Sequence, residues 1–428
     1  MSYLYEEYFQ LGPELIKKIK RVEDKIQPYI NNIQETVLDN QAKMLNAFKE
    51  NRVSEFHFAG STGYGYNDSG RQVLENIYAE VFGAEEALVR TQFVSGTHSL
   101  SVCLDALLSP GETLLSAAGA PYDTLQKVIG LPSSPSKGTL LQKGVNYRQV
   151  ELTPHGTLDL PELERIMKKI KSVTVVLLQR SRGYAWRPAV TLAEIESLSQ
   201  LIKKINPKII LFVDNCYGEF VNPLEPTQVG ADLIAGSLIK NPGGGLAPTG
   251  GYAAGRKDLM ELIADRLTAP GLGKEVGATL THNRSLFQGY FLAPHGVGEA
   301  LKAAVFAAAL FEEMGFEVSP FFHQPRSDIV QAIQFNNPQT MLSFCRGIQK
   351  HAPVDSYVQP QPAILAGYGD QVVMAAGTFI QGGSLELSAD APYRPPYIAY
   401  LQGGLTFEHG KIAVIGAAKE VLETLNRN

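Results

Sequence analysis

Apolar and polar positions change their spacing along the chain, and each spacing predicts a kind of element. Between residues 13 and 50, apolar side chains recur at the spacing of one helix face, which predicts an amphipathic N-terminal arm. Its apolar stripe consists of Leu15, Ile16, Ile19, Val22 and Ile26. Such a stripe has to be covered, either by the body of the same subunit or by a partner chain.

From residue 70 onwards, apolar strands alternate with helices. Two strands, at 173–179 and 209–214, are rich in Val, Ile and Leu, which is typical of parallel strands buried on both faces. We therefore expect an α/β domain with a mainly parallel sheet between helices. The other predicted elements are strands at 87–90 and 113–116 and helices at 71–82, 98–108, 161–170, 192–205, 257–267 and 296–314.

After Gly315 the pattern becomes shorter and more mixed, which predicts a small C-terminal α+β domain. We expect strands at 329–335 and 372–375 and a helix at 339–350 in this part. The predicted organisation is an N-terminal helical arm of residues 1–55, a large domain of residues 56–299 and a small domain of residues 300–428. A chain of 428 residues suits this division, since one domain usually takes roughly 100–200 residues.

The composition narrows the classes of function. Hydrophobic residues at 44% and charged residues at 19% describe a globular protein. A formal net charge of −5 gives no overall positive field, so nucleic acid is not an expected partner. The cysteines Cys103, Cys216 and Cys345 lack metal-binding or disulfide-framework spacing. With no export signal and no apolar run long enough to cross a bilayer, we expect a cytoplasmic protein without a membrane partner.

Candidate chemistry begins with Asp214, which ends the strand at 209–214. Ligands of open α/β sheets bind beyond the carboxyl ends of the strands. A carboxylate in this place can pair with a protonated ring nitrogen, as a pyridinium needs when it acts as an electron sink. The simpler interpretation is that Asp214 caps the turn of residues 215–218.

Lys240 follows another apolar segment, at 232–236. A lysine just past a buried segment loses solvation, which is expected to lower its pKa and to favour the nucleophilic amine of Schiff-base chemistry. Most lysines have no such role. The adjacent run of Gly243, Gly244 and Gly245 would let the backbone approach a bulky ligand closely.

Two further segments could complete a cofactor site. Ser95, Gly96 and Thr97 open a predicted helix after a strand, where free backbone N–H groups bind phosphate well. Ordinary N-capping by Ser95 or Thr97 would use the same residues. Tyr122 lies in a loop near the same sheet edge, where it could stack on a flat heteroaromatic ring or simply pack its loop.

Taken in order, the segments around Ser95, Tyr122, Asp214 and Lys240 resemble those of the fold-type I pyridoxal 5′-phosphate (PLP) enzymes of the cystathionine and methionine lyase superfamily. Within it, the chain is most similar to the methionine γ-lyase-like, aluminium-resistance-associated proteins. The similarity extends from residue 60 to residue 409. It implies a PLP-dependent transferase-like fold with PLP as the cofactor and a small amino acid as the substrate. It also implies a homodimer or homotetramer with active sites at the subunit interface.

The resemblance assigns roles to these residues. It implies that Lys240 forms the internal aldimine with the cofactor, that Asp214 pairs with the pyridine nitrogen and that Tyr122 stacks on the ring. Ser95, Gly96, Thr97 and Ser237 would hold the phosphate. Tyr64 would contact the phosphate of a neighbouring subunit.

The substrate α-carboxylate needs a cation, and the candidate by resemblance is Arg394. Its guanidinium could hold a carboxylate through two parallel hydrogen bonds. Arg180, Arg182 and Arg187 are alternatives near a sheet edge.

Three departures separate the chain from the better-known lyases. Tyr64-Gly65-Tyr66 stands in place of Tyr-x-Arg, Ser237-Leu238-Ile239-Lys240 in place of Ser-x-Thr-Lys, and residues 179–184 in place of an Asn-Pro segment. They leave the cofactor prediction intact and weaken the substrate prediction. The leading hypothesis is a carbon–sulfur lyase that performs β- or γ-elimination on a cystathionine-, cysteine- or methionine-type substrate. Alternatives are a PLP-dependent aminotransferase or aldolase, or a non-catalytic stress-associated protein that uses the fold as a scaffold.

Overall fold

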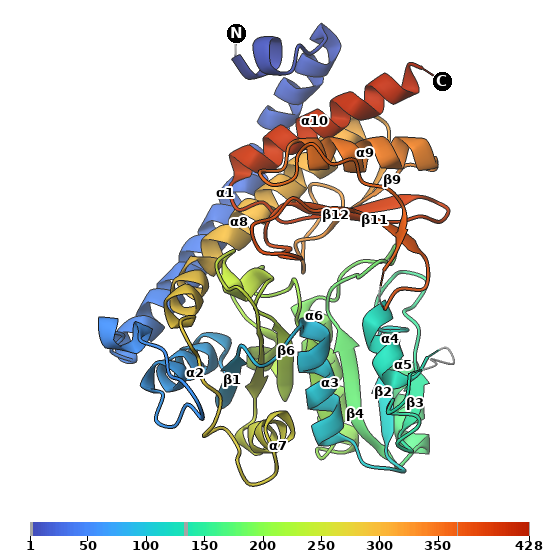
Figure 1. The fold of residues 1–428 in the computed structure, drawn as a ribbon. Helices are drawn as coiled ribbons and strands as arrows, with labels where there is room; N and C mark the ends of the chain where they lie inside the picture. Colours follow the sequence, from blue (N-terminus) through green and yellow to red (C-terminus); the bar gives the residue numbers. More distant parts are fainter. Residues whose placement is uncertain (1–2, 132–135, 366, 428) are drawn as a thin grey trace. The chain divides into compact units, whose positions relative to one another are not determined.

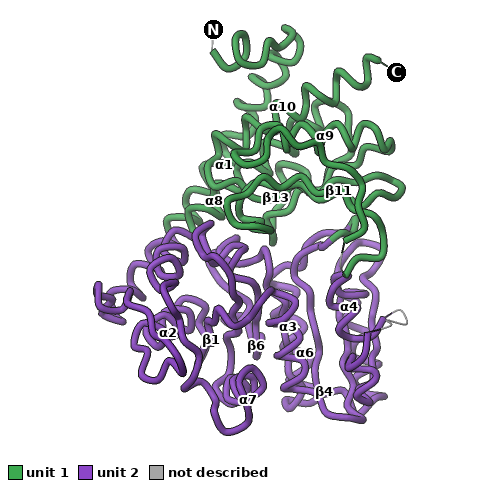
Figure 2. The backbone as a smooth tube through the Cα atoms, viewed as in Figure 1, with its two compact units in different colours: residues 1–38, 184–186, 294–428 green, residues 39–183, 187–293 purple. Residues whose placement is uncertain are grey.

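The computed structural model describes residues 3–131, 136–365 and 367–427 (Figure 1). By internal contacts the chain divides into two compact units (Figure 2). Unit 1 comprises residues 1–38, 184–186 and 294–428, and unit 2 comprises residues 39–183 and 187–293. These borders differ from the predicted domain borders at 55/56 and 299/300.

Unit 2 is built on a seven-stranded sheet whose strands are β1 (Glu86–Arg90), β2 (Thr113–Ser116), β3 (Asn146–Gln149), β4 (Val173–Gln179), β5 (Ile210–Asp214), β6 (Leu233–Ser237) and β7 (Gly251–Gly255). Their spatial order is β1-β7-β6-β5-β4-β2-β3. The strands β2 to β6 run parallel to one another, and β7 is antiparallel to both β1 and β6. This mainly parallel sheet confirms the predicted α/β fold class.

The central strands β4, β5 and β6 of this sheet are apolar and buried on both faces. Leu177 and Phe212 point to one face, where they join a core with the helices α3 (Gly96–Leu107), α4 (Asp123–Ile129) and α7 (Lys257–Leu267). All residues of β5 are buried. Burial on both faces explains why the sequence shows continuous apolar runs here instead of alternation.

Local sequence signals fix the ends of the remaining helices of unit 2. Asp68 accepts the backbone N–H of Arg71 at the start of one helix, and Gly83 ends that helix with a φ of 64°. Thr191 and Glu194 form a reciprocal capping box at the start of another. These helices are α2 (Ser69–Phe82), α5 (Leu160–Lys169) and α6 (Leu192–Ile205), with short 3₁₀ turns at Glu55–Phe58, Pro226–Val229 and Asn241–Gly243.

Unit 1 contains a six-stranded antiparallel sheet. Its strands are β8 (Glu317–Ser319), β9 (Gln331–Gln334), β10 (Ala363–Ile364), β11 (Gln371–Ala375), β12 (Ser388–Pro392) and β13 (Ile398–Gln402). They are arranged in the order β10-β11-β12-β13-β9-β8. The helices α9 (Pro338–Lys350) and α10 (Phe407–Leu425) pack against each other, and a short π-helix spans Leu4–Tyr8.

The predicted N-terminal arm is a single long helix, α1 (Pro13–Glu50). Its buried residues Leu15, Ile19 and Val22 belong to the same core as the apolar part of α8 (Asn283–Glu313). Lys18 also donates a 2.7 Å hydrogen bond to the carbonyl oxygen of Glu313. The stripe is therefore covered by its own chain.

The structure departs from the predicted elements in the C-terminal half. Helix α8 begins at Asn283 and not at the predicted residue 296. The prediction started too late because Pro294 and several glycines, which disfavour a helix, lie within the first part of α8. Helix α10 and the strands β12 and β13 were not predicted. Among the described residues, no helix is long and apolar enough to span a bilayer.

Candidate cofactor site

Asp214 and Lys240 stand beyond neighbouring strands of unit 2. Asp214 is the last residue of β5, and Lys240 follows the last residue of β6 by three positions. The two strands are parallel, and the register pairs Asp214 with Gln179 on one side and Ala235 on the other. The fold therefore brings both residues to the same edge of the sheet, as predicted from their positions after apolar strands.

The amine of Lys240 lies against an aromatic ring. Its Nζ is 4.0 Å from the centroid of the Tyr217 ring, within the range of a cation–π contact. Tyr217 has a φ of 72°, a left-handed backbone conformation that is uncommon for residues with a side chain. The turn after Asp214 therefore adopts a costly conformation where it places this ring beside the lysine.

The pKa of Lys240 differs from the sequence-based expectation. Burial disfavours its ammonium form, but Cys216, Tyr217, Asp214 and Glu219 together favour that form more strongly. The pKa of Lys240 is therefore raised above its ordinary value, and the prediction of a lowered pKa is wrong. The prediction considered desolvation alone and omitted the acidic groups that lie around the amine in the folded chain.

Asp214 is buried and also caps its own turn. Its Oδ1 accepts the backbone N–H of Cys216 at 3.1 Å, which is the simpler role that the sequence allowed. Burial raises the pKa of Asp214, and the positive charge of Lys240 and the bond from Cys216 oppose this effect. The capping bond uses Oδ1 and not Oδ2.

The start of helix α3 packs tightly against this edge. A side-chain Cβ at Gly96 would lie 3.1 Å from Cβ of Ser237 and 3.6 Å from Sγ of Cys216. Ser95 caps the helix, since its Oγ accepts the backbone N–H of His98 at 3.1 Å. The structure thus brings Ser95, Gly96 and Ser237 together at a helix N-terminus, an arrangement that favours an anion.

Thr97 and Tyr122 join the same group of contacts. The hydroxyls of Thr97 and Thr124 lie 2.7 Å apart, which ties the start of α3 to the start of α4. The backbone N–H of Tyr122 donates to Oε1 of Gln179 at 2.6 Å. A Cβ at Gly183 would lie 3.3 Å from the Tyr122 ring. Tyr122 is therefore anchored to the end of β4, the strand that neighbours β5.

Tyr64 is not brought to this group by the described chain alone. Its side chain is 73% exposed, and its ring lies 5.5 Å from the ring of Tyr66. Its carbonyl oxygen accepts the backbone N–H of Gly277 at 2.9 Å. A contact from Tyr64 to a phosphate at the start of α3 remains a prediction that involves a second subunit.

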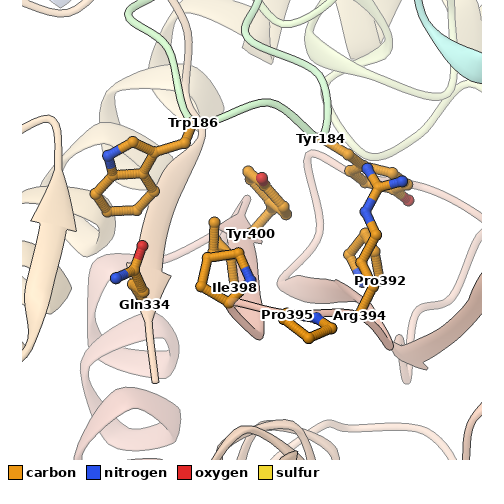
Figure 3. Close-up of a pocket in the computed structure, with 9 residues that line it drawn as sticks. Tyr184, Trp186, Gln334, Pro392, Arg394, Pro395, Ile398 and Tyr400 are labelled. Carbon is orange, nitrogen blue, oxygen red and sulfur yellow. The ribbon is translucent and has the colours of Figure 1, made fainter. Parts of the chain in front are cut away.

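The candidate arginines differ in their surroundings. Arg394 belongs to unit 1, where it forms an ion pair with Asp370 and lines a pocket (Figure 3). Arg180 is fully buried, and its Nη1 donates to Oδ1 of Asn215 at 2.8 Å and to the carbonyl oxygen of Gly218 at 2.9 Å. Arg180 therefore braces the turn after Asp214.

The two other arginines follow Arg180 in the chain. Arg182 is buried, and Arg187 donates to the carbonyl oxygen of Ser181 at 2.6 Å. Arg187 thereby fastens its own segment. Of the four candidates, Arg394 is the one that lines a described pocket.

The glycine run beside the lysine lies in a closely packed part of the backbone. A Cβ at Gly243 would lie 1.7 Å from the carbonyl oxygen of Leu238, and one at Gly244 would lie 2.0 Å from that of Gly289. These glycines therefore let three backbone segments pack closely.

A buried carboxylate at Glu219 was missed by sequence reasoning. Its Oε1 accepts the hydroxyl of Tyr252 at 2.8 Å, and its Oε2 has no hydrogen-bond partner among the described residues. Burial raises the pKa of Glu219 to about 8, with a smaller contribution from Glu225. A Cβ at Gly236 would lie 2.8 Å from Oε1, so the glycine in β6 makes room for this pair.

Glu219 is also tied to the lysine turn. Asn241, which follows Lys240, donates a 3.0 Å hydrogen bond to the carbonyl oxygen of Glu219. The available sequence signal was an acidic residue in an apolar segment five positions after Asp214. A turn would explain that signal equally well.

Comparison with known proteins decides the family. The protein-family model described as methionine gamma-lyase matches residues 15–422. The chain belongs to the methionine γ-lyase family. This confirms the resemblance inferred from the ordered motifs.

Two relatives of this methionine γ-lyase family member extend over nearly the whole chain. The uncharacterized protein YnbB of Bacillus subtilis is 47% identical over 412 residues, which cover 96% of this chain and 97% of that protein. The crystal structure of a carbon-sulfur lyase involved in aluminum resistance from Clostridium novyi NT is 50% identical, with a TM-score of 0.93. This similarity covers 96% of this chain and 97% of the Clostridium novyi chain.

A more distant solved structure is similar in fold only. The pyridoxal-5′-phosphate dependent protein YhfS of Escherichia coli is 17% identical, with a TM-score of 0.61 over 92% of this chain and 97% of that chain. The methionine γ-lyase family member therefore has the fold of PLP-dependent enzymes, as its sequence predicts.

Proposed function

We propose that this protein is a PLP-dependent carbon–sulfur lyase that performs β- or γ-elimination on a sulfur-containing amino acid of the cystathionine, cysteine or methionine type. The observation that carries the proposal is the meeting of Lys240 and Asp214 at one sheet edge in a member of the methionine γ-lyase family. An amine and a carboxylate in this place are the two groups that a pyridine aldehyde cofactor requires.

The residues at this edge fit the cofactor. Gly96 leaves a side-chain-free position between the start of α3 and Ser237, and a phosphate there would face the N-terminus of a helix. Ser95, Thr97 and Ser237 would supply further contacts to the phosphate. Asp214 is a buried carboxylate whose pKa is raised, so a positively charged ring nitrogen would stabilise its ionised form. Tyr122 would lie against the ring.

When bound, PLP supplies a sink for the electrons left at the substrate Cα after its proton is removed. Asp214 would keep the ring nitrogen protonated by accepting its hydrogen bond. Nζ of Lys240 would hold the cofactor before the substrate arrives and would take up the Cα proton after the substrate displaces it.

The charge of Lys240 sets a condition on this scheme. Because its pKa is raised, Nζ carries a proton that it must lose before it can bond to an aldehyde carbon. Asp214 and Glu219 both favour its ammonium form. We infer that formation of the cofactor bond is faster at higher pH.

We also propose contributions from unit 1 and from a neighbouring subunit. Arg394 would bind the substrate α-carboxylate, and the exposed Tyr64 would contact the phosphate bound by a neighbouring subunit. This second role requires a homodimer or homotetramer. Sedimentation velocity of the purified protein would measure the assembly, and a monomer that retains activity would rule out the role of Tyr64.

The function is tested by incubating the PLP-loaded protein separately with cystathionine, cysteine and methionine. The proposal expects a free thiol and a keto acid in equal amounts from at least one of them, and neither product from Lys240→Ala. Conversion of the cofactor to its pyridoxamine form without release of a thiol would indicate transamination instead. No product and no spectral change with any of the three substrates would contradict the proposal.

A further inference from the structure

Unit 1 contains a pocket with aromatic walls and a volume of about 260 Å³. In Figure 3, Tyr184 and Trp186 descend from one loop on two sides of the pocket, and Ile398 and Tyr400 of β13 lie between them. Arg394 stands on the side of Tyr184. Three prolines and Gln334 complete the lining. This volume is slightly below the roughly 300–1,000 Å³ of most small-molecule sites, so the pocket suits a small ligand.

The wall formed by Tyr184 is held in place. Its hydroxyl donates to Oδ2 of Asp390 at 2.9 Å, and the amide of Gln402 donates to the same oxygen at 3.0 Å. The ring of Tyr184 lies 5.4 Å from that of Tyr400 and 5.8 Å from that of Tyr368. A ring fixed by its hydroxyl and by its neighbours presents an apolar face without further ordering, which lowers the cost of binding.

The charges of the lining favour an anion. Of the nine residues that line the pocket, Arg394 is the one that is charged. Its Nη1 pairs with Asp370, but both side chains are about half exposed, with 52% and 45% of their surfaces accessible. Such exposed pairs are screened by solvent and contribute little to stability. A ligand carboxylate could therefore replace or share this contact, and the guanidinium fork suits it.

The rest of the lining suits an uncharged group. Tyr184, Trp186, Ile398 and Tyr400 offer rings and an aliphatic chain, and no carboxylate lines the pocket to receive a second, positive end of a ligand. Burying an unpaired charge there would be costly. A flat or branched apolar group in the pocket would pack against these side chains.

We propose that this pocket binds a monocarboxylate with an apolar arm, the carboxylate at Arg394 and the arm against the aromatic and aliphatic side chains of the lining. For the substrate, the inference rests on the proposed function. If the pocket holds the substrate, it favours sulfur amino acids with an apolar group on sulfur, such as methionine or S-benzylcysteine. Cystathionine should bind less well, because its far end carries two charges.

The chain provides its own probe, because Trp186 is the single tryptophan of the sequence. Full-length protein is titrated with hydrocinnamate while tryptophan emission is recorded. The ligand has neither an amino group nor sulfur, so its binding does not depend on cofactor chemistry. We expect a saturable change in emission that Lys240→Ala retains, whatever the outcome of the lyase assay. Hydrocinnamyl alcohol, which lacks the charge, and glutarate, which lacks the ring, should each bind at least about tenfold more weakly.

Arg394→Gln should weaken hydrocinnamate binding at least about tenfold, and Arg394→Lys should fall between Gln and wild type because it keeps the charge and loses the fork. Arg21→Gln is the matched control, an exposed arginine of unit 1 that pairs with Glu313, and it should bind like wild type. Absence of a saturable change in Trp186 emission would overturn the proposal. Equal affinity for the acid and the alcohol, or unchanged affinity in Arg394→Gln, would do the same.

Discussion

The hydroxyl of Tyr252 donates a 2.8 Å hydrogen bond to Oε1 of Glu219, and both side chains are buried in unit 2. The pair joins β7 to the turn that follows Asp214. Tyr217 and Phe220, with φ values of 72° and 62°, flank Glu219 in that turn. The turn that borders the candidate cofactor site therefore has two residues in the left-handed conformation, and the buried carboxyl group of Glu219 lies between them.

The first prediction concerns stability against pH. Burial raises the folded-state pKa of Glu219 to about 8, whereas its ordinary value is 4.5. Between these values the folded state binds one more proton than the unfolded state. Stability from this group is therefore full below about pH 4.5 and is lost as the pH rises towards 8, by at most about 1.4 kcal/mol per pH unit.

Glu219→Gln removes this dependence. Chemical unfolding at a series of pH values should show a free energy of unfolding that falls less steeply with pH in the variant than in wild type. Glu55→Gln, at an exposed position, is the control and should follow wild type. Parallel curves for wild type and Glu219→Gln would mean that Glu219 is ionised in the folded protein at neutral pH.

The second prediction concerns Arg180. This buried side chain lies 3.6 Å from the carboxylate of Glu225 and binds Asn215 and Gly218. Arg180→Leu leaves Glu225 without its cation, which should lower the free energy of unfolding by about 3–5 kcal/mol. Urea unfolding measures this loss. The double variant Arg180→Leu with Glu225→Leu should lose less than the single variant, and an equal or larger loss would show that the ion pair is not the cause.

The third prediction concerns Gly96. A methyl group there would meet Ser237 at 3.1 Å, so Gly96→Ala should shift the start of α3 by a few tenths of an ångström and weaken the retention of PLP about tenfold. Equilibrium dialysis against PLP measures the affinity. Gly12→Ala, where a Cβ meets nothing within 4 Å, should bind PLP like wild type. An unchanged affinity in Gly96→Ala would place the phosphate elsewhere.

The parts of the fold that were predicted well are those where local sequence and burial agree. The strands at 113–116 and 173–179 and the helices at 192–205 and 257–267 have the predicted bounds. The strand at 173–179 is a continuous apolar run, and a capping box marks the start of the helix at 192–205. Helix α8 was predicted to begin too late, because Pro294 lies within it. Packing of its apolar face outweighs the unfavourable propensity of that residue.

In the candidate site too, some residues could be found from the local sequence and others could not. Asp214 and Lys240 could be found from the sequence because each follows an apolar strand, and parallel strands end at one edge. Glu219 could not, since its burial depends on Tyr252 and on the space left by Gly236. The raised pKa of Lys240 was missed for a related reason, because the groups that cause it come from the turn after β5.

Reduction with borohydride followed by peptide mass spectrometry would identify the lysine that carries PLP. Reduction fixes the cofactor to its lysine, and we predict a pyridoxyl group on the peptide that contains Lys240 and none on Lys240→Ala. Lys43 is the main alternative as the lysine that binds PLP, because burial lowers its pKa, whereas the pKa of Lys240 is raised. A pyridoxyl group on Lys43, or reduced protein that releases all its PLP on unfolding, would show that Lys240 does not carry the cofactor.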